Sequence, residues 1–537
     1  MQDEIKTDYC IVGAGIAGIL LAYKMAGTGK KVVILDQGPH ITEEDRANLR
    51  QKSIENLNDF ADYNDNVDPK IITPHSSANS GDQVVNYTNF RLFGIGGTAL
   101  HFQGIMMRPL EEDLQVKTLF GYGRDWPITY AELEPWLLEA EKEIGVAANE
   151  DNPYASPRSG PFPMKAHPFS YFDREIFGPS LKKLGIKGHS CPFSVNSSIY
   201  NNRPACQACR ACKFCPSGAR YSPDRVHFPL LLEHPNLQII DSVSLRRLET
   251  GSDGRRILAA QATRIKERTP LLVTANKFIL AMGGVEIPRA LFLSASNGHH
   301  KDGLGNMGGQ LGLGFSDHDG PLAIYDAGRK VGNRLGFETM MTDHFRINED
   351  RKKEPTFSIF ASPATDWIPV GTTAVQWATK NNTLSLEELR NGMTRYVSIW
   401  TQTELQGNGK LELDHDNLDA FGAPLAKITM TLTDWDRQGY SKASDTIAQI
   451  GEAMGASNIS DIPPPGDGLG YHPSGASAMA SNPDEGVCDT NLKVFGLHNL
   501  YLVGNSVFPH LGSNPPTLTI AALALRLAAH FEGKKSI

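Results

Sequence analysis

The chain has no long apolar run and no block of basic residues. A helix needs about 20 consecutive apolar residues to cross a bilayer. None of the 537 residues lies in such a stretch, so we expect no membrane span in the chain itself. Lys and Arg number 52 against 60 Asp and Glu, which gives a net charge of −8. Without a basic patch, neither a nucleic acid nor an anionic membrane surface is an expected partner.

The first eight residues lack the features of a targeting segment. They contain no basic region, no apolar core and no pair of arginines. We therefore expect no export signal within the chain. Its length exceeds what one small core needs, so at least two packed units are expected.

Cysteine is scarce and unevenly distributed. Three of the seven cysteines, Cys10, Cys191 and Cys488, lie far apart. The other four are separated by two residues each time: Cys206, Cys209, Cys212 and Cys215. A disulfide framework would spread its cysteines along the chain, so this cluster predicts metal ligands.

Thiolates at this spacing, followed by a proline at position 216, are typical of iron–sulfur sites. Four thiolates also suit tetrahedral zinc. Zinc ribbons, however, separate their two cysteine pairs by about a dozen residues or more, which favours iron here. The cluster type stays open between 4Fe–4S on all four cysteines and 3Fe–4S on three of them, and unligated thiols are the remaining alternative.

The start of the chain predicts a βαβ unit. An apolar strand from Asp8 is followed by a glycine turn, a helical stretch and a second strand at 31–35. The turn has the spacing G-x-G-x-x-G and the second strand ends in an acid; the residues are Gly13, Gly15, Gly18 and Asp36. This order predicts dinucleotide binding, with the pyrophosphate at the helix N-terminus and the acid on a ribose hydroxyl. The unit alone does not choose between FAD and NAD, and the alternative is a glycine-rich turn in an unrelated α/β domain.

A second glycine-rich segment follows at 91–104. It lies too far along the chain to belong to the first unit, and its glycines bring backbone close to a flat or anionic group. The candidate cofactor contacts here are Gly96, Gly97, Thr98, His101 and Gly104.

Residues 331–464 differ from the βαβ start. Strands are expected at 396–403 and at 428–432, where apolar and polar residues alternate. A helix is predicted from Asp434, with one apolar side formed by Trp435, Ala443, Ile447, Ile450 and Met454. This part is therefore expected to be an α+β block.

Five segments resemble the glucose-methanol-choline (GMC) oxidoreductase family, in a likeness that runs from residue 8 to about 530. They are residues 121–135, 280–294, 471–479, 488–506 and 513–520. Within the family, the chain is most similar to flavin subunits of bacterial FAD-dependent sugar dehydrogenases (glucose, fructose, gluconate and glycoside 3-dehydrogenase). It is more distantly similar to pyranose oxidase.

The resemblance implies an α/β plus α+β fold, in which a Rossmann-like FAD-binding domain is joined to a substrate domain with an antiparallel sheet. The implied domains are a discontinuous FAD-binding domain at 1–130, 225–330 and 465–537, a lid and cysteine-cluster insertion at 131–224, and a substrate-binding domain at 331–464.

Oxidation of an alcohol needs a base for the hydroxyl proton, and histidine suits this role near neutral pH. The resemblance implies His472 as that base and Asn514 as a hydrogen-bond donor to the alcohol oxygen. Asp317 and His318 resemble a further family segment, but their spacing requires no chemistry, so we expect them to be structural. The further FAD contacts implied by the resemblance are Gly283, Gly504, Asn505, Asn514 and Thr517.

The resemblance leaves the role of His101 open. Pyranose oxidase-like relatives attach FAD covalently through a histidine at this offset, whereas glucose dehydrogenase-like relatives have a histidine without an assured bond. Contact with FAD without a covalent link is favoured.

The sequence thus predicts an FAD-dependent dehydrogenase that oxidises a hydroxyl of a sugar or glycoside and passes electrons through an iron–sulfur cluster to an external acceptor. The resemblance implies a small partner subunit that supplies an export signal, and a cytochrome-type acceptor. With such a partner the location is periplasmic; without one it is cytoplasmic. The alternatives are a flavin sugar oxidase that uses oxygen and a non-catalytic flavin-binding protein.

Overall fold

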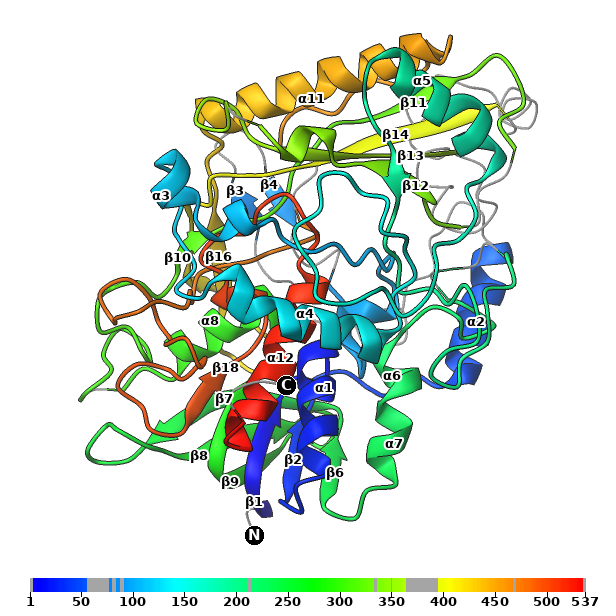
Figure 1. Ribbon diagram of the computed structural model, residues 1–537. Coiled ribbons are helices and arrows are strands. Elements are labelled where there is room, and N and C mark those ends of the chain that lie inside the picture. The colour runs from blue at the N-terminus through cyan, green and yellow to red at the C-terminus, as the bar shows by residue number, and fades with distance from the viewer. Residues whose placement is uncertain are drawn as a thin grey trace.

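The computed structural model describes residues 3–55, 77–79, 84–86, 91–209, 212, 214–296, 298–332, 336–348, 350–363, 395–466 and 470–534. The chain forms two halves (Figure 1). The lower half in that view is built on a seven-stranded sheet and holds the N-terminus. The upper half is built on a six-stranded sheet that lies under the long helix α11 (Asp434–Ala453).

The seven-stranded sheet collects strands from both ends of the chain. They are β1 (Asp3–Val12), β2 (Val32–Leu35), β6 (Leu237–Ile240), β7 (Val243–Thr250), β8 (Ile257–Arg264), β9 (Thr269–Leu280) and β18 (Leu500–Leu502). Their order is β6-β2-β1-β9-β8-β7, and β18 also pairs with β9. β1 is parallel to β2 and β9, whereas β8 is antiparallel to both of its neighbours. The predicted βαβ start and Rossmann-like sheet are confirmed.

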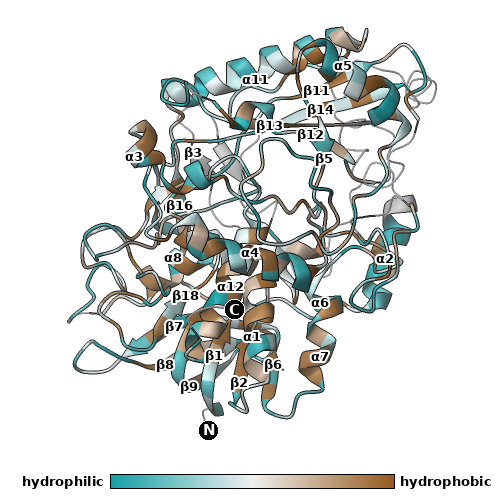
Figure 2. Ribbon diagram, in the orientation of Figure 1, coloured by the Kyte–Doolittle hydropathy of each residue, from teal (hydrophilic) through white to brown (hydrophobic). Residues whose placement is uncertain are grey.

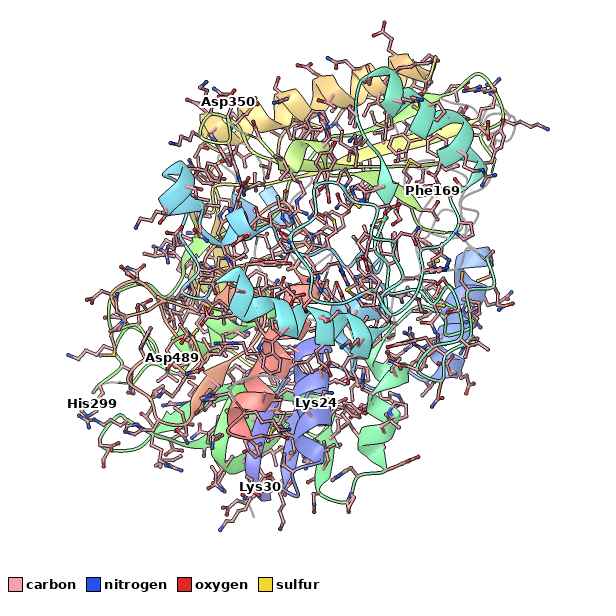
Figure 3. All side chains as sticks on the ribbon, viewed as in Figure 1. Lys24, Lys30, Phe169, His299, Asp350 and Asp489 are labelled. Carbon is pink, nitrogen blue, oxygen red and sulfur yellow. The ribbon has the colours of Figure 1, made fainter. Side chains whose placement is uncertain are left out.

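Two helices from opposite ends of the chain pack on this sheet. α1 (Ile16–Ala26) lies against α12 (Thr517–Phe531), and both are rich in buried alanine and leucine (Figure 2). α4 (Tyr130–Ile144) packs across α12. Lys24 of α1, labelled in Figure 3, forms an ion pair with Glu143 of α4. The first and last helices are therefore parts of one core.

The six-stranded sheet is antiparallel throughout, with the order β17-β11-β14-β13-β12-β5. Its strands are β5 (His189–Ser190), β11 (Leu322–Asp326), β12 (Met340–Thr342), β13 (Phe357–Pro363), β14 (Tyr396–Thr403) and β17 (Ser457–Asn458). The apolar side of α11 packs on it through Ala443, Ile447 and Ile450. The expected strand at 396–403 and the expected helix from Asp434 are both confirmed.

A third sheet has the order β10-β15-β16-β3-β4. Its strands are β3 (Ser77–Asn79), β4 (Val84–Asn86), β10 (Leu313–Phe315), β15 (Gly409–Leu418) and β16 (Pro424–Thr429). β16 ends at Thr429, so only the first part of the strand expected at 428–432 is a strand.

The described residues also form several further helices and helical turns. They are α2 (Glu43–Glu55), α3 (Val116–Phe120), α5 (Gly178–Lys183), α6 (Pro223–Val226), α7 (Phe228–Leu232), α8 (Gly283–Leu293) and the 3-10 turns η2 (Gly97–Leu100), η3 (Glu111–Leu114), η5 (His344–Arg346) and η6 (Asn505–Val507), with a π-helical turn η4 (Asp173–Phe177). Within the described ranges, no helix combines the length and apolar character that a bilayer crossing requires.

The N-terminus of α11 offers a test of the upper half. The Thr433 hydroxyl accepts a hydrogen bond from the N–H of Asp436 (3.2 Å), and the Asp436 carboxylate accepts one from the N–H of Thr433 (2.7 Å). We expect Thr433→Ala to lower the free energy of unfolding by about 1 kcal/mol, because a helix donor loses its partner. Thr433→Ser keeps the hydroxyl acceptor, so it should lower the free energy of unfolding by only a few tenths of a kcal/mol. Urea unfolding followed by circular dichroism measures both, and equal losses would contradict this role.

Candidate active site

Three loops from distant parts of the chain meet beside the upper end of the seven-stranded sheet. Residues 316–318 follow β10, residues 470–475 carry His472, and residues 505–514 follow β18. An antiparallel bridge joins Ser316 to Ser474, and the N–H of Gly475 donates to the carbonyl of Asn505 (3.0 Å). The loop of His472 is therefore held from both sides.

Asp317 stabilises the junction of these three loops through hydrogen bonds. Its fully buried carboxylate accepts hydrogen bonds from the backbone N–H groups of His318 (2.7 Å), Gly470 (2.8 Å) and His472 (2.8 Å). Burial raises the pKa of Asp317 to about 7. The side chain thus fixes the backbone of the predicted base from a different loop.

His472 contacts a second histidine. The Nδ1 atoms of His472 and His318 lie 2.9 Å apart, and the two rings cross at 83°. On its other side, His318 Nε2 lies 2.8 Å from the carbonyl oxygen of Gly512. The expectation that His318 is merely structural is too weak, because the side chain touches the predicted base directly.

Both imidazoles are neutral at pH 7. Burial lowers the pKa of His472 to about 4. Burial, together with the neighbouring His472, lowers the pKa of His318 well below its usual range. A neutral imidazole keeps one lone pair, so His472 is in the form that accepts a proton.

Asn514 lies two residues beyond the carbonyl that His318 contacts. It is 2% exposed, and its Oδ1 has no hydrogen-bond partner among the described residues. Its Nδ2 makes one long contact, of 3.3 Å, with the carbonyl of Pro515. A buried amide left in this state is suited to a partner that is not part of the chain.

A buried charged network lies behind the turn of Gly512. Arg351 contacts Glu404 (2.6 Å) and Asp113 (2.7 Å), and His510 contacts the same Glu404 oxygen (2.6 Å). Burial opposes the ionisation of Glu404, but the charge of Arg351 and the hydrogen bond from His510 hold its pKa well below the usual range. Sequence reasoning missed these residues, since no spacing or motif links positions so far apart.

The first glycine turn leaves an opening at the N-terminus of α1. A Cβ on Gly18 would lie 1.9 Å from the carbonyl oxygen of Gly13, and a Cβ on Gly13 would lie 2.5 Å from that of Ala281, so close packing requires both glycines. Gly15, in contrast, has no atom within 4 Å of its Cβ position, and the Cβ position of Gly97 contacts only Gly15. This opening fits a pyrophosphate, because backbone N–H groups at a helix N-terminus attract anions.

Asp36 ends β2 next to this turn. Its carboxylate accepts hydrogen bonds from the N–H groups of Ala14 (2.6 Å) and Gly38 (2.8 Å). Burial raises its pKa to about 7. The residue predicted to bind a ribose hydroxyl therefore also braces the glycine turn.

A second group of predicted cofactor contacts lies beside the His472 loop. Gly283 begins α8, with open space at its Cβ position. The Cβ position of Gly504 lies 3.8 Å from the Cα of Gly283. Asn505 Nδ2 donates to the carbonyl of Pro473 (2.5 Å), directly after His472. Thr517 is the first residue of α12 and follows the turn of Asn514.

The third group surrounds η2. Thr98 is exposed and His101 is partly exposed just after this turn. Gly104 lies close to Ser194: its Cβ position is 2.8 Å from the Ser194 hydroxyl, and its carbonyl accepts a hydrogen bond from the Ser194 N–H (2.8 Å). Gly104 thus packs against the segment that leads to the cysteines.

Arg220 joins the cysteine loop to the segment of His101. Its backbone N–H donates to the Cys215 sulfur (3.3 Å). Its buried guanidinium donates to the carbonyl oxygens of Leu100 (2.5 Å) and Phe102 (2.8 Å), one on each side of His101. One residue, through its backbone and its side chain, therefore couples a thiol to the predicted flavin-contact segment.

The four clustered thiols share a loop but not one centre. Cys215 is buried and the other three are partly buried. Cys206, Cys212 and Cys215 pack against one apolar cluster, which includes Phe193. In the part of the chain that the structure describes, no three Cys, His, Asp or Glu side chains are arranged to hold a metal ion.

Comparison with known proteins adds independent evidence. Two family models, each described as GMC oxidoreductase, match residues 95–320 and 406–524 and together cover more than half of the chain. A model described as an NAD(P)-binding Rossmann-like domain matches residues 11–50.

Two relatives that match nearly the whole chain are also flavin-enzyme subunits or dehydrogenases by name. The fructose dehydrogenase large subunit of Gluconobacter japonicus is 28% identical over 98% of each chain. The gluconate 2-dehydrogenase flavoprotein of Pantoea cypripedii is 22% identical over 96% of this chain and 92% of its own. The crystal structure of pyridoxine 4-oxidase from Mesorbium loti shares the fold, with a TM-score of 0.66 and 18% identity over 98% of this chain and 99% of its own. The chain belongs to the GMC oxidoreductase family and is an FAD-dependent oxidoreductase that acts on CH–OH groups.

Proposed function

We propose that this chain is a dehydrogenase that oxidises a hydroxyl group of a sugar or glycoside to a carbonyl. The observation that carries the proposal is the geometry of His472, which Asp317 and His318 hold beside the turn of Asn514. Sugar-like substrates are supported by the full-length relatives named for fructose and gluconate.

In this reaction His472 is the general base. As the substrate O–H bond breaks, the proton passes to the ring nitrogen of His472 that does not face His318. Asn514 donates a hydrogen bond from Nδ2 to the alcohol oxygen, a role that suits an amide nitrogen whose one contact in the structure is long, at 3.3 Å from the carbonyl of Pro515. Together the two side chains bind the hydroxyl and remove its proton.

The residues of the two glycine groups fit FAD. Gly15 and Gly97 border the opening that suits the pyrophosphate, and Gly283 and Gly504 lie beside the His472 loop. When bound, FAD supplies the acceptor for the hydride that leaves the alcohol carbon. The predicted contact through His101 is proposed without a covalent bond.

We further infer from the cysteine spacing that residues 206–215 take up an iron–sulfur cluster. The thiols do not converge on one centre in the structure, so uptake requires the loop to rearrange around the metal, as ligand loops commonly do. Such a cluster would supply one-electron chemistry towards an external, cytochrome-type acceptor. A small partner subunit with an export signal, and a periplasmic location, belong to the same proposal.

Removal of the base tests the proposal. We expect His472→Ala to lower the rate of flavin bleaching by the best sugar of a hexose and glycoside panel by roughly 10²- to 10⁴-fold, measured anaerobically. Asn514→Ala should cost about a hundredfold, because one hydrogen bond to the developing oxyanion is lost. His299→Ala is the matched control, since His299 is exposed at the edge of the lower half (Figure 3). Bleaching by His472→Ala at the wild-type rate would overturn the assignment.

The low pKa of His472 predicts a specific pH profile. Its folded pKa of about 4 lies below the ordinary value, so the neutral base persists through pH 6–8 and is lost only as the pH falls through about 4. The bimolecular rate of flavin bleaching should therefore be flat from pH 6 to 8 with respect to this group. A profile that halves near pH 6.5 would instead indicate a solvated histidine base.

The cysteines provide a third test. Iron and acid-labile sulfide assays should find about three or four of each per chain. Cys215→Ser should lower the iron content and the turnover with cytochrome c, while anaerobic flavin bleaching by the sugar continues. Gln207→Ala in the same loop is the control, because the Gln207 side chain is exposed and contacts the carbonyl of Ala205. Stoichiometric zinc without iron, or peroxide formation in air as the main reaction, would favour the oxidase alternative.

A further inference from the structure

We propose that His318 is a positioning residue that keeps the proton of His472 on Nδ1, so that the Nε2 lone pair faces the alcohol. The inference rests on the proposed role of His472 as base and concerns how that base is prepared. The observation behind it is the chain of hydrogen bonds from His472 through His318 to the carbonyl of Gly512.

The direction of this chain follows from its last member. A carbonyl oxygen only accepts, so His318 Nε2 carries a hydrogen and donates it to Gly512 (2.8 Å). A neutral imidazole has one N–H, and His318 Nδ1 is therefore a lone-pair acceptor. The facing atom, His472 Nδ1, lies 2.9 Å away and must be the donor. The single hydrogen of neutral His472 is then on Nδ1, and its Nε2 is free to accept a proton.

The other tautomer of His472 is disfavoured in this setting. It would place two nitrogen lone pairs 2.9 Å apart within a buried junction, and it would leave both without a donor. Protonation of His318 would relieve that clash, but burial and the neighbouring His472 oppose it. The ionisable groups that face His318 are His472, Glu404 and His510, along with Asp317 in the preceding position.

The acceptor at the end of the chain is itself held in place. Gly512 has a φ of +69°, and a Cβ there would lie 3.1 Å from the carboxyl carbon of Asp113. The next residue, Ser513, receives a hydrogen bond on its carbonyl from Gln402 (3.2 Å), and its hydroxyl contacts that of Thr356 (3.1 Å). The Gly512 carbonyl cannot turn away from His318 without disturbing this packing.

This arrangement also fits the step that follows. When the alcohol O–H bond breaks and a new N–H bond forms at Nε2, His472 becomes a cation and keeps its Nδ1–H bond to His318. The acceptor is a neutral ring and not a carboxylate, so it orients the base without holding the proton strongly. The proton is therefore easily returned to solvent in the next cycle.

Two substitutions separate positioning from general stability. His318→Gln keeps one acceptor and one donor side by side, whereas His318→Leu has neither. Anaerobic flavin bleaching by D-fructose, or by the panel sugar that bleaches the wild type fastest, should slow roughly 10- to 100-fold in His318→Leu. His318→Gln should recover most of that loss, with KM and FAD content near wild type in both. Equal losses in the two variants, or a loss in KM alone, would overturn the proposal.

A second measurement needs no turnover. In protein labelled with ¹⁵N in the histidine rings, His472 should show a protonated Nδ1 and a bare Nε2 at pH 7, and His318 the reverse, with signals assigned from His318→Gln and His472→Ala. The opposite tautomers would overturn the proposal even if His318→Leu fails to fold. If the tautomers are as expected but no sugar bleaches the flavin, the proposed function fails and the role of His318 stands.

Discussion

The hydrogen bond between His318 and His472 is the contact on which the rest of the site depends. It joins two loops that are 154 residues apart, and through the carbonyl of Gly512 it reaches a third loop. The Asp317 carboxylate stabilises the same junction by accepting hydrogen bonds from three backbone N–H groups. These segments come from the middle and the end of the chain. The hydrogen bonds around His472 therefore form only after these distant segments have packed together.

Burial explains how charge is distributed around this contact. Two neutral imidazoles are cheaper to bury than an ion pair, since an ion loses far more hydration than a neutral ring. Arg351 forms ion pairs with Glu404 and Asp113 at hydrogen-bonding distance, behind the turn of Gly512. A carboxylate in the position of His318 would stabilise a protonated His472 and raise the pKa of that histidine. The two side chains proposed to contact the alcohol, His472 and Asn514, are thus uncharged, and the ion pairs of Arg351 lie behind the turn.

Local patterns in the sequence predicted the elements that depend on nearby residues. The βαβ start, the strand Tyr396–Thr403 and the helix from Asp434 were all readable, because glycine spacing and apolar periodicity act over a few residues. The charged network was not readable, since its members pair only after the fold has brought them together. The spacing around His318 requires no chemistry, and spacing cannot reveal a partner that lies in another loop.

The sheet topology also has a consequence for biosynthesis. β18 completes the sheet that β1 begins, and α12 packs on α1, so the core around β1 is closed by segments that are synthesised long after it. At about 5–20 residues per second, the first βαβ unit is exposed for roughly half a minute or longer before its closing strand exists. The sheet is therefore complete only after β18 has been made, and α1 gains its neighbour α12 later still.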